Sequence, residues 1–228
     1  ESGVVWPLYK ALEFKEKLGC AVHVDSVQSV GKIRDWNKLE SDLDAYTFSA
    51  HKFGGMKGIG FSFMKKDFPY ECFVRGGGQQ AALRSGTENV MGIYSIKLAL
   101  EDLQRNQNFD ETEFVHREFE SWLLSKIGDK GKIAGYGNVS RNMTTTYLVL
   151  PGNRSDIMMT ALDLAGVEVS AGSACSSGIL KPSRILKGMG FSEKEAGEGI
   201  RFSFSPTFTK EDLPALFEKL DKVLSKYL

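Results

Sequence analysis

Three short apolar segments most constrain what the first part of this chain can fold into. They cover residues 21–25, 45–50 and 59–64, and apolar runs of this length, bounded by turn-forming or charged residues, predict buried strands. A helix is expected over residues 7–18, because Pro7 suits its first turn and a glycine follows its end. A helix followed by a strand, a connector and two further strands predicts a layered α/β domain with a largely parallel sheet.

Reactive side chains follow two of these predicted strands. Asp25 ends the first, and Lys52 follows the second, beside Ser49 and His51 and ahead of a glycine-rich stretch. Ligands of open α/β sheets bind at the carboxyl ends of the strands, so we expect these side chains to share one site. A lysine amine can form a Schiff base with an aldehyde, while a hydroxyl and an imidazole can bind phosphate oxygens. With a carboxylate for a pyridinium nitrogen, the pattern predicts a site for pyridoxal phosphate, PLP.

The rest of the chain predicts a second α/β unit beyond a boundary near residue 105. A helix over residues 89–105 is expected to lead toward this unit. Helical spacing of apolar residues predicts helices over residues 110–127 and 213–227, and Gly166 ends a further helix expected over residues 156–165. Further strands are expected over residues 144–150, 167–171 and 200–204. Ser155 is expected to cap the helix that follows it, and Ser192 with Glu195 forms a predicted capping box.

Composition narrows the function classes. Lysine plus arginine total 29 and aspartate plus glutamate total 29, so the formal net charge is zero. This balance gives no reason to expect a nucleic acid or a membrane surface as a partner, and no apolar run approaches the roughly 18–20 residues of a membrane span. The cysteines, Cys20, Cys72 and Cys175, are too scattered for a disulfide framework or a zinc site. We therefore expect no metal and a reducing, cytoplasmic setting.

Five segments resemble, in order and in spacing, the motifs of NifS/IscS-type cysteine desulfurases in the class V branch of fold-type I PLP enzymes. They are residues 23–32, 49–52, 84–89, 172–178 and 200–203. The resemblance implies the C-terminal part of a fold-type I PLP-dependent transferase, with a partial, mostly parallel sheet, followed by a smaller α/β domain. Residues 1–105 would then complete the PLP-binding large domain, and residues 106–228 would form the small domain.

The resemblance also implies roles for the residues near the predicted cofactor. Lys52 resembles the lysine that holds PLP and moves protons on the substrate, and Asp25 resembles the partner of the pyridinium nitrogen. Gln28 is similar to the residue that hydrogen-bonds the phenolic oxygen of the ring. Ser49 and His51 would hold the phosphate, and His51 is counted with Lys52 among the catalytic residues.

Three further residues extend the implied site. Thr87 resembles a threonine that reaches the phosphate of the neighbouring subunit in a homodimer. Arg201 would bind the carboxylate of L-cysteine with a forked geometry that lysine does not offer. Cys175, in a stretch rich in glycine and serine, would attack the substrate sulfur as a thiolate and leave L-alanine and a Cys175 persulfide. The implied partner is a sulfur-acceptor protein or an iron–sulfur scaffold.

Two departures from the family pattern matter. Residues 79–83 lack the acidic and basic residues that relatives carry after the glycines at 76–78. In family members a sizeable portion precedes the position of Glu1 and supplies early strands, a histidine that stacks on the PLP ring and a threonine that binds the phosphate. A sheet without its first strands exposes an edge and an apolar face. We therefore expect this chain alone to bind PLP weakly and to turn over cysteine poorly.

Two alternatives stay open at this stage. A class V aminotransferase or a selenocysteine lyase would use Asp25, Gln28 and Lys52 and would not need Cys175. A non-catalytic fragment could instead serve as a dimerisation or partner-binding module.

Some remaining cysteine and histidine side chains receive structural roles. Cys20 and Cys72 are expected to be structural or incidental. His23 is expected to pack within its strand, and His116 is expected on the surface of a helix.

Overall fold

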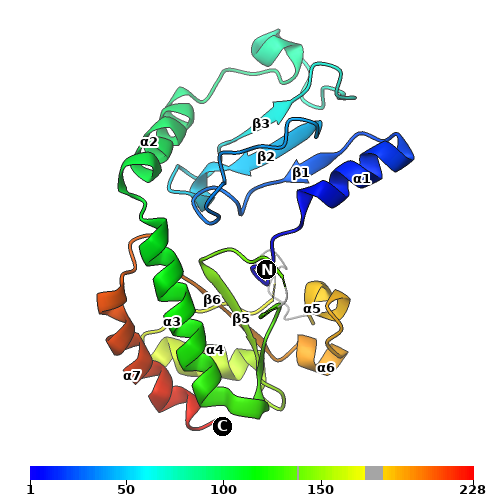
Figure 1. Cartoon of the computed structure of the whole chain (residues 1–228). Helices are drawn as coiled ribbons and strands as arrows, with labels where there is room; N and C mark the ends of the chain where they lie inside the picture. Colours follow the sequence, from blue (N-terminus) through cyan, green and yellow to red (C-terminus); the bar gives the residue numbers. More distant parts are fainter. Residues whose placement is uncertain (138, 173–181) are drawn as a thin grey trace. The chain divides into compact units, whose positions relative to one another are not determined.

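Two compact units make up the chain in the computed structural model, which describes residues 1–137, 139–172 and 182–228 (Figure 1). The N-terminal unit is Pro7–Gln107, and the C-terminal unit joins Glu1–Trp6 to Asn108–Leu228. Residues 1–6 therefore group with the C-terminal unit, whereas the sequence analysis places them in the predicted large domain, residues 1–105. The identification of these units as a large and a small domain stays a prediction.

Backbone pairing explains why residues 1–6 belong to the C-terminal unit. Val4 forms an antiparallel bridge with Arg141. The Val5 N–H donates to the carbonyl of Ser140 at 2.8 Å. The first residues therefore run beside residues 140–142 as an added extended segment, a pairing that no local pattern indicates.

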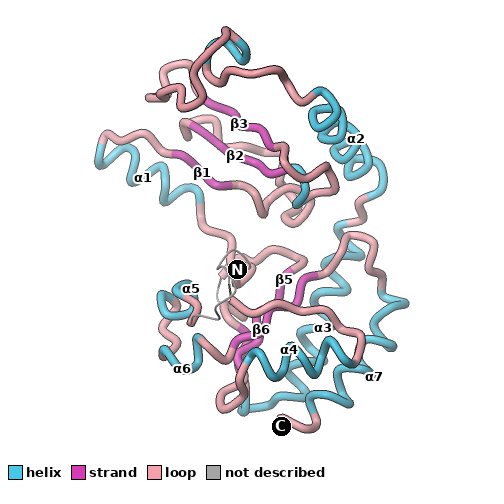
Figure 2. Tube along the Cα trace, turned by 180° about the vertical axis from the view of Figure 1, so that it is seen from behind, coloured by secondary structure: helices cyan, strands magenta, loops and turns pink. Residues whose placement is uncertain are grey.

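The N-terminal unit contains a mixed three-stranded sheet, ordered β1-β2-β3 (Figure 2). Strand β1 (His23–Asp25) is parallel to β2 (Ala45–Ser49), and β3 (Gly60–Met64) is antiparallel to β2. The expectation of a largely parallel sheet is therefore wrong for β3. The chain between β2 and β3 is a short turn around the helical turn η1 (Ala50–Lys52), and a parallel crossover needs a dozen or more residues.

Two helices border this sheet in sequence, and local signals set their ends. Helix α1 (Leu8–Leu18) ends where Gly19 adopts a left-handed conformation with φ of 60°. Helix α2 (Val90–Asn106) begins at Asn89, whose side chain accepts a hydrogen bond from the Gly92 N–H at 2.9 Å. The core that these elements bury comprises Ala11, Val30, Leu43, Tyr46, Phe48, Ala50, Phe53, Ala99 and Leu103.

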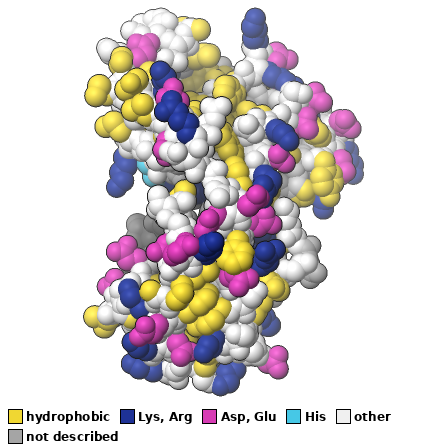
Figure 3. All heavy atoms as spheres, turned by 60° about the vertical axis from the view of Figure 1, so that its left-hand side comes forward, with side chains coloured by type: hydrophobic (Ala, Val, Ile, Leu, Met, Phe, Trp, Pro, Cys, Tyr) yellow, Lys and Arg dark blue, Asp and Glu magenta, His cyan; other side chains and the backbone are white. Residues whose placement is uncertain are grey.

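Helix α2 also carries an apolar stripe that the described residues leave exposed. Val90, Met91, Tyr94 and Leu98 are 48–71% exposed and recur at helical spacing. Apolar side chains, coloured yellow, also gather on the face of the molecule drawn in Figure 3. Large apolar side chains that are exposed together on one helix face are typical of an interaction site.

The C-terminal unit packs helices around an antiparallel sheet, ordered β4-β5-β6. Its strands are β4 (Lys132–Ile133), β5 (Thr145–Val149) and β6 (Gly199–Ser203). Its helices are α3 (Phe109–Ile127), α4 (Ser155–Leu164), α5 (Arg184–Gly188), α6 (Glu193–Ala196) and α7 (Leu213–Leu224). One apolar stripe of α3, comprising Val115, Phe119, Leu123 and Ile127, lies in the main core. Within the described residues, no helix combines the length and apolar character needed to cross a membrane.

Local predictions in this unit succeed where both partners are close in sequence. The capping box of Ser192 and Glu195 is confirmed at the start of α6. Ser155 does not cap α4: it is the first helical residue, and its hydroxyl donates to the carbonyl of Gly197 at 3.0 Å. The strand expected over residues 167–171 is also wrong, because Ser170 forms only an isolated bridge to β6.

Candidate cofactor site

Asp25 and Lys52 lie at the ends of neighbouring strands of the N-terminal unit. Asp25 is the last residue of β1 and is paired in register with Thr47 of β2. Lys52 lies in η1, directly after β2. Because β1 and β2 are parallel, their carboxyl ends lie at the same edge of the sheet, which is where such sheets bind ligands.

The turn that carries Lys52 is held by close backbone packing. The N–H of Gly55 donates to the carbonyl of Ala50 at 2.9 Å. A Cβ atom at position 55 would lie 2.8 Å from the Cβ of Ala50, closer than two such atoms approach. Glycine at this position therefore lets the chain fold back on η1. Ala50 itself is fully buried, so η1 is anchored in the core while the Lys52 side chain stays half-buried.

Local hydrogen bonds orient two of the predicted cofactor ligands. The Asp25 carboxylate accepts the N–H of Val27 at 3.1 Å through Oδ1, and its second oxygen can accept further hydrogen bonds. Gln28 Oε1 accepts from the ammonium group of Lys32. An ammonium only donates, so the amide oxygen must face Lys32 and the amide N–H groups of Gln28 are left to donate elsewhere.

The hydroxyl and imidazole proposed for phosphate binding are adjacent. Ser49 Oγ lies 3.0 Å from Nδ1 of His51. Together with Lys52, Asp25 and Gln28, they provide an amine, a carboxylate, an amide donor, a hydroxyl and an imidazole on or beside β1 and β2. This donor set fits PLP, which needs an amine for its aldehyde, an acid for its ring nitrogen and donors for its phosphate.

The prediction that His23 packs within its strand is wrong. It is exposed, and its Nε2 lies 2.6 Å from Oγ1 of Thr47, which is 3.1 Å from Oγ of Ser62. His23, Thr47 and Ser62 thus form a polar chain across the three strands. A sequence signal for this polar chain exists. Successive side chains of a strand point to opposite faces of the sheet, so His23 and Thr47 share the face opposite to that of Val24 and Tyr46.

The other predicted site residues have different settings. Thr87 is exposed in the loop that precedes α2, and its role toward a second subunit stays a prediction. Arg201 belongs to β6 of the C-terminal unit, where it is half-buried and pairs in register with Tyr147. Cys175 lies outside the described residues.

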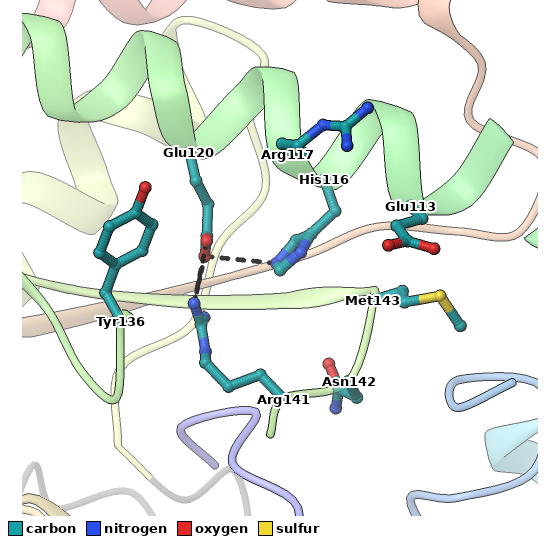
Figure 4. A pocket seen from close by; sticks show the side chains of 8 residues that line it. All are labelled: Glu113, His116, Arg117, Glu120, Tyr136, Arg141, Asn142 and Met143. Atoms are coloured by element: carbon teal, nitrogen blue, oxygen red, sulfur yellow. Dashed lines mark hydrogen bonds and ion pairs between the residues drawn. The ribbon is translucent and has the colours of Figure 1, made fainter. Parts of the chain in front are cut away.

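A polar pocket of about 210 Å³ lies in the C-terminal unit (Figure 4). It is lined by Glu113, His116, Arg117, Glu120, Tyr136, Arg141, Asn142 and Met143. Arg141 Nη1 lies 2.8 Å from Oε1 of Glu120, and both side chains are at least nine-tenths buried. The hydroxyl of Thr146 donates to the same carboxylate oxygen at 2.6 Å. This buried ion pair has no counterpart among the predicted site residues.

The prediction that His116 lies on a helix surface is wrong. His116 is 8% exposed, and its Nε2 lies 3.0 Å from the hydroxyl of Thr146 and 3.2 Å from the carbonyl of Thr145. Burial lowers the pKa of His116, and Arg141 acts in the same direction, whereas Glu120 raises it. A sequence signal exists, because positions 116 and 120 are one turn apart and adjoin the apolar stripe of α3.

This pKa shift predicts a pH-dependent stability. In the unfolded chain His116 binds a proton more readily than in the folded chain, so the free energy of unfolding should fall as the pH drops below about 6.5. Replacing His116 with glutamine should remove this part of the slope. Urea unfolding at pH 7.5 and 5.5 measures it. Equal losses of stability in the wild type and in H116Q would contradict the prediction.

The family model described as aminotransferase class-V matches residues 1–216. A cysteine desulfurase of Sinorhizobium fredii is 33% identical over 230 residues, which cover 99% of this chain and 58% of that protein. A cysteine desulfurase IscS of Dictyoglomus turgidum is 31% identical over 229 residues, which cover 99% of this chain and 57% of that protein.

A solved structure is similar over the same part of this chain. The X-ray structure of a NifS-like protein from Rickettsia africae is 29% identical, with a TM-score of 0.80, over 99% of this chain and 59% of that one. The similarity therefore includes both units. The chain spans 57–59% of the length of these relatives.

Proposed function

This chain belongs to the class-V aminotransferase family, and from this membership we propose that it is part of a PLP-dependent cysteine desulfurase. The proposed reaction converts L-cysteine to L-alanine and leaves the sulfur as a persulfide on Cys175. The observation that carries the proposal is the parallel pairing of β1 with β2, which brings Asp25, at the end of β1, and the turn with Lys52, after β2, to one sheet edge. The similarity to cysteine desulfurases over 99% of the chain supports it.

Each residue near the sheet edge would contribute one interaction. When bound, PLP supplies an electron sink for the bond that breaks on the substrate. The amine of Lys52 would bind the aldehyde and carry protons to and from substrate carbons. Asp25 would keep the ring nitrogen protonated, and Gln28 would donate to the phenolic oxygen with the amide hydrogens that Lys32 leaves available.

The remaining residues would bind phosphate and substrate. Ser49 and His51 would bind the phosphate, with Thr87 reaching that of a second subunit. The guanidinium of Arg201 would bind the carboxylate of L-cysteine through two parallel hydrogen bonds. Cys175 would attack the substrate sulfur as a thiolate: an S–S bond forms, the C–S bond breaks with its electron pair staying on carbon, and a proton added there completes L-alanine.

We propose a homodimer that passes the sulfur to an acceptor protein, such as an iron–sulfur scaffold. The exposed apolar stripe of α2 supports an interface, because Val90, Met91, Tyr94 and Leu98 are unusually open for large apolar side chains. The stripe does not distinguish a second subunit from an acceptor. Cross-linking of the protein alone and with a scaffold would distinguish them.

Transfer of radioactive sulfur tests the proposed function. With PLP and ³⁵S-labelled L-cysteine, the protein should gain a label that a reducing thiol releases. Cys175→Ala should lower this label to background, because no other thiol is expected to receive the sulfur. Cys20→Ala and Cys72→Ala, which also remove free thiols, should retain it. A single transfer is counted, so poor turnover by this chain alone does not hide the result.

The outcomes separate the three hypotheses. Sulfide release that is undiminished in C175A would favour an aminotransferase or lyase reaction over a desulfurase. A folded protein that takes up neither PLP nor label would favour a non-catalytic module. Label on wild type that C20A or C72A removes would contradict the assignment of Cys175.

A further inference from the structure

Tyr147 is a fully buried tyrosine that no proposed catalytic step uses. It lies in β5, in register with Arg201 of β6, and its exposed fraction is 0%. The ring has a prepared place, because a Cβ atom at Gly199 would lie 3.0 Å from both Cζ and Oη of the tyrosine. Only glycine at position 199 admits the ring without displacement.

The hydroxyl of Tyr147 makes specific polar contacts inside this core. It accepts the N–H of Gly172 at 3.0 Å. The pKa of Tyr147 is raised to about 12, chiefly by burial; Glu1 acts in the same direction through its charge and a hydrogen bond, while the Gly172 N–H and Arg201 act against it. The hydroxyl is therefore neutral at pH 7, and it lies within electrostatic reach of both Glu1 and Arg201.

Residues 170–172 are hydrogen-bonded through Ser170 to β6, the strand that contains Arg201. The Arg201 N–H donates to the carbonyl of Ser170 at 2.6 Å, and the Ser170 N–H donates to the carbonyl of Arg201 at 3.1 Å. Gly172 adopts a left-handed conformation with φ of 59°. The Tyr147 hydroxyl thus fixes residues 170–172 at one end, and the bridge to Arg201 fixes them at the other.

We propose that Tyr147 is a positioning residue for Arg201, holding residues 170–172 and β6 so that the guanidinium is presented to the carboxylate of the substrate. This inference rests on the proposed function for the identity of that carboxylate. Tyr147→Phe is the matching test, because it keeps the ring in its place and removes the hydroxyl alone. Two readouts are needed, one structural and one for substrate binding.

Hydrogen exchange is the structural readout. In Y147F the Gly172 N–H loses its acceptor, so its exchange should accelerate about 2- to 10-fold. Tyr46→Phe is the matched control: Tyr46 is 4% exposed, lies in the N-terminal unit and donates to the carbonyl of Glu40 at 2.8 Å. It should lower stability without changing exchange at Gly172.

The substrate readout is the L-cysteine concentration that half-saturates sulfur labelling. Y147F should raise it about 3- to 10-fold with little change in the label reached at saturation, the pattern of weaker ground-state binding. Arg201→Gln should raise it more, and Y46F should leave it unchanged. If R201Q has no effect, the proposed role of Arg201 fails, and this inference fails with it. If R201Q weakens binding and Y147F changes neither readout, the inference alone is overturned.

Discussion

Replacing Glu120 with alanine is expected to lower the free energy of unfolding by about 3–5 kcal/mol, the usual cost of removing one partner from a buried ion pair. The side chains of Glu120 and Arg141 are 7% and 8% exposed, and their charged atoms are 2.8 Å apart. Without Glu120, the Arg141 guanidinium keeps the carbonyl of Thr145 as an acceptor, 2.9 Å from Nη2. A neutral acceptor does not compensate a buried positive charge.

Urea unfolding measures this effect, and the chain offers a matched control. Glu218 forms an exposed ion pair with Lys222 at 2.7 Å on α7, so Glu218→Ala should change stability little. Replacing Glu120 with leucine and Arg141 with methionine together should cost less than E120A, because neither charge is then left buried alone. A loss in E120A as small as that in E218A would contradict the ion pair.

Replacing Asp25 with asparagine is expected to weaken PLP binding about 30-fold or more. This factor is the lower end of the usual cost of removing one partner of a charge pair, and it applies because Asp25 is exposed to solvent. Asparagine has nearly the same shape, and its Oδ1 can still accept the N–H of Val27, so the turn after β1 should persist. What changes is the negative charge that would face the ring nitrogen. The expected loss therefore reports electrostatics rather than folding.

Titration of the protein with PLP, followed by absorbance, gives the two affinities. Asp35→Asn is the control, because Asp35 is also an exposed aspartate of the N-terminal unit and pairs with Lys38 at 2.8 Å. Its affinity for PLP should match that of the wild type. Equal affinities for D25N and D35N would remove Asp25 from the site.

The sequence predicts those parts of the fold whose determinants are local. Helix α1 ends at Gly19, and the capping box at Ser192 needs partners only one turn away. The placement of Asp25 and Lys52 also follows from local order, because Asp25 ends β1 and Lys52 lies in the turn that follows β2. Parallel pairing of β1 with β2 then gives both strand ends the same edge.

The features that the sequence pattern does not give depend on distant partners. The spacing of positions 116 and 120 beside the apolar stripe of α3 hints that His116 is buried, but its hydrogen-bond partners Thr145 and Thr146 lie in β5, far away in the sequence. Ser155 donates to Gly197 rather than capping its own helix. The direction of β3 depends on the length of the connection between β2 and β3, and the apolar pattern that predicts the strands does not take this length into account.

Identification of the lysine that binds PLP tests the central claim most directly. The protein is incubated with PLP and reduced with borohydride, which makes the link between amine and aldehyde permanent, and the modified peptide is found by mass spectrometry. The account predicts that the pyridoxyl group is on Lys52, with little on the exposed Lys57 of the adjoining glycine-rich turn. Modification centred on Lys57, or spread evenly over many lysines, would contradict it.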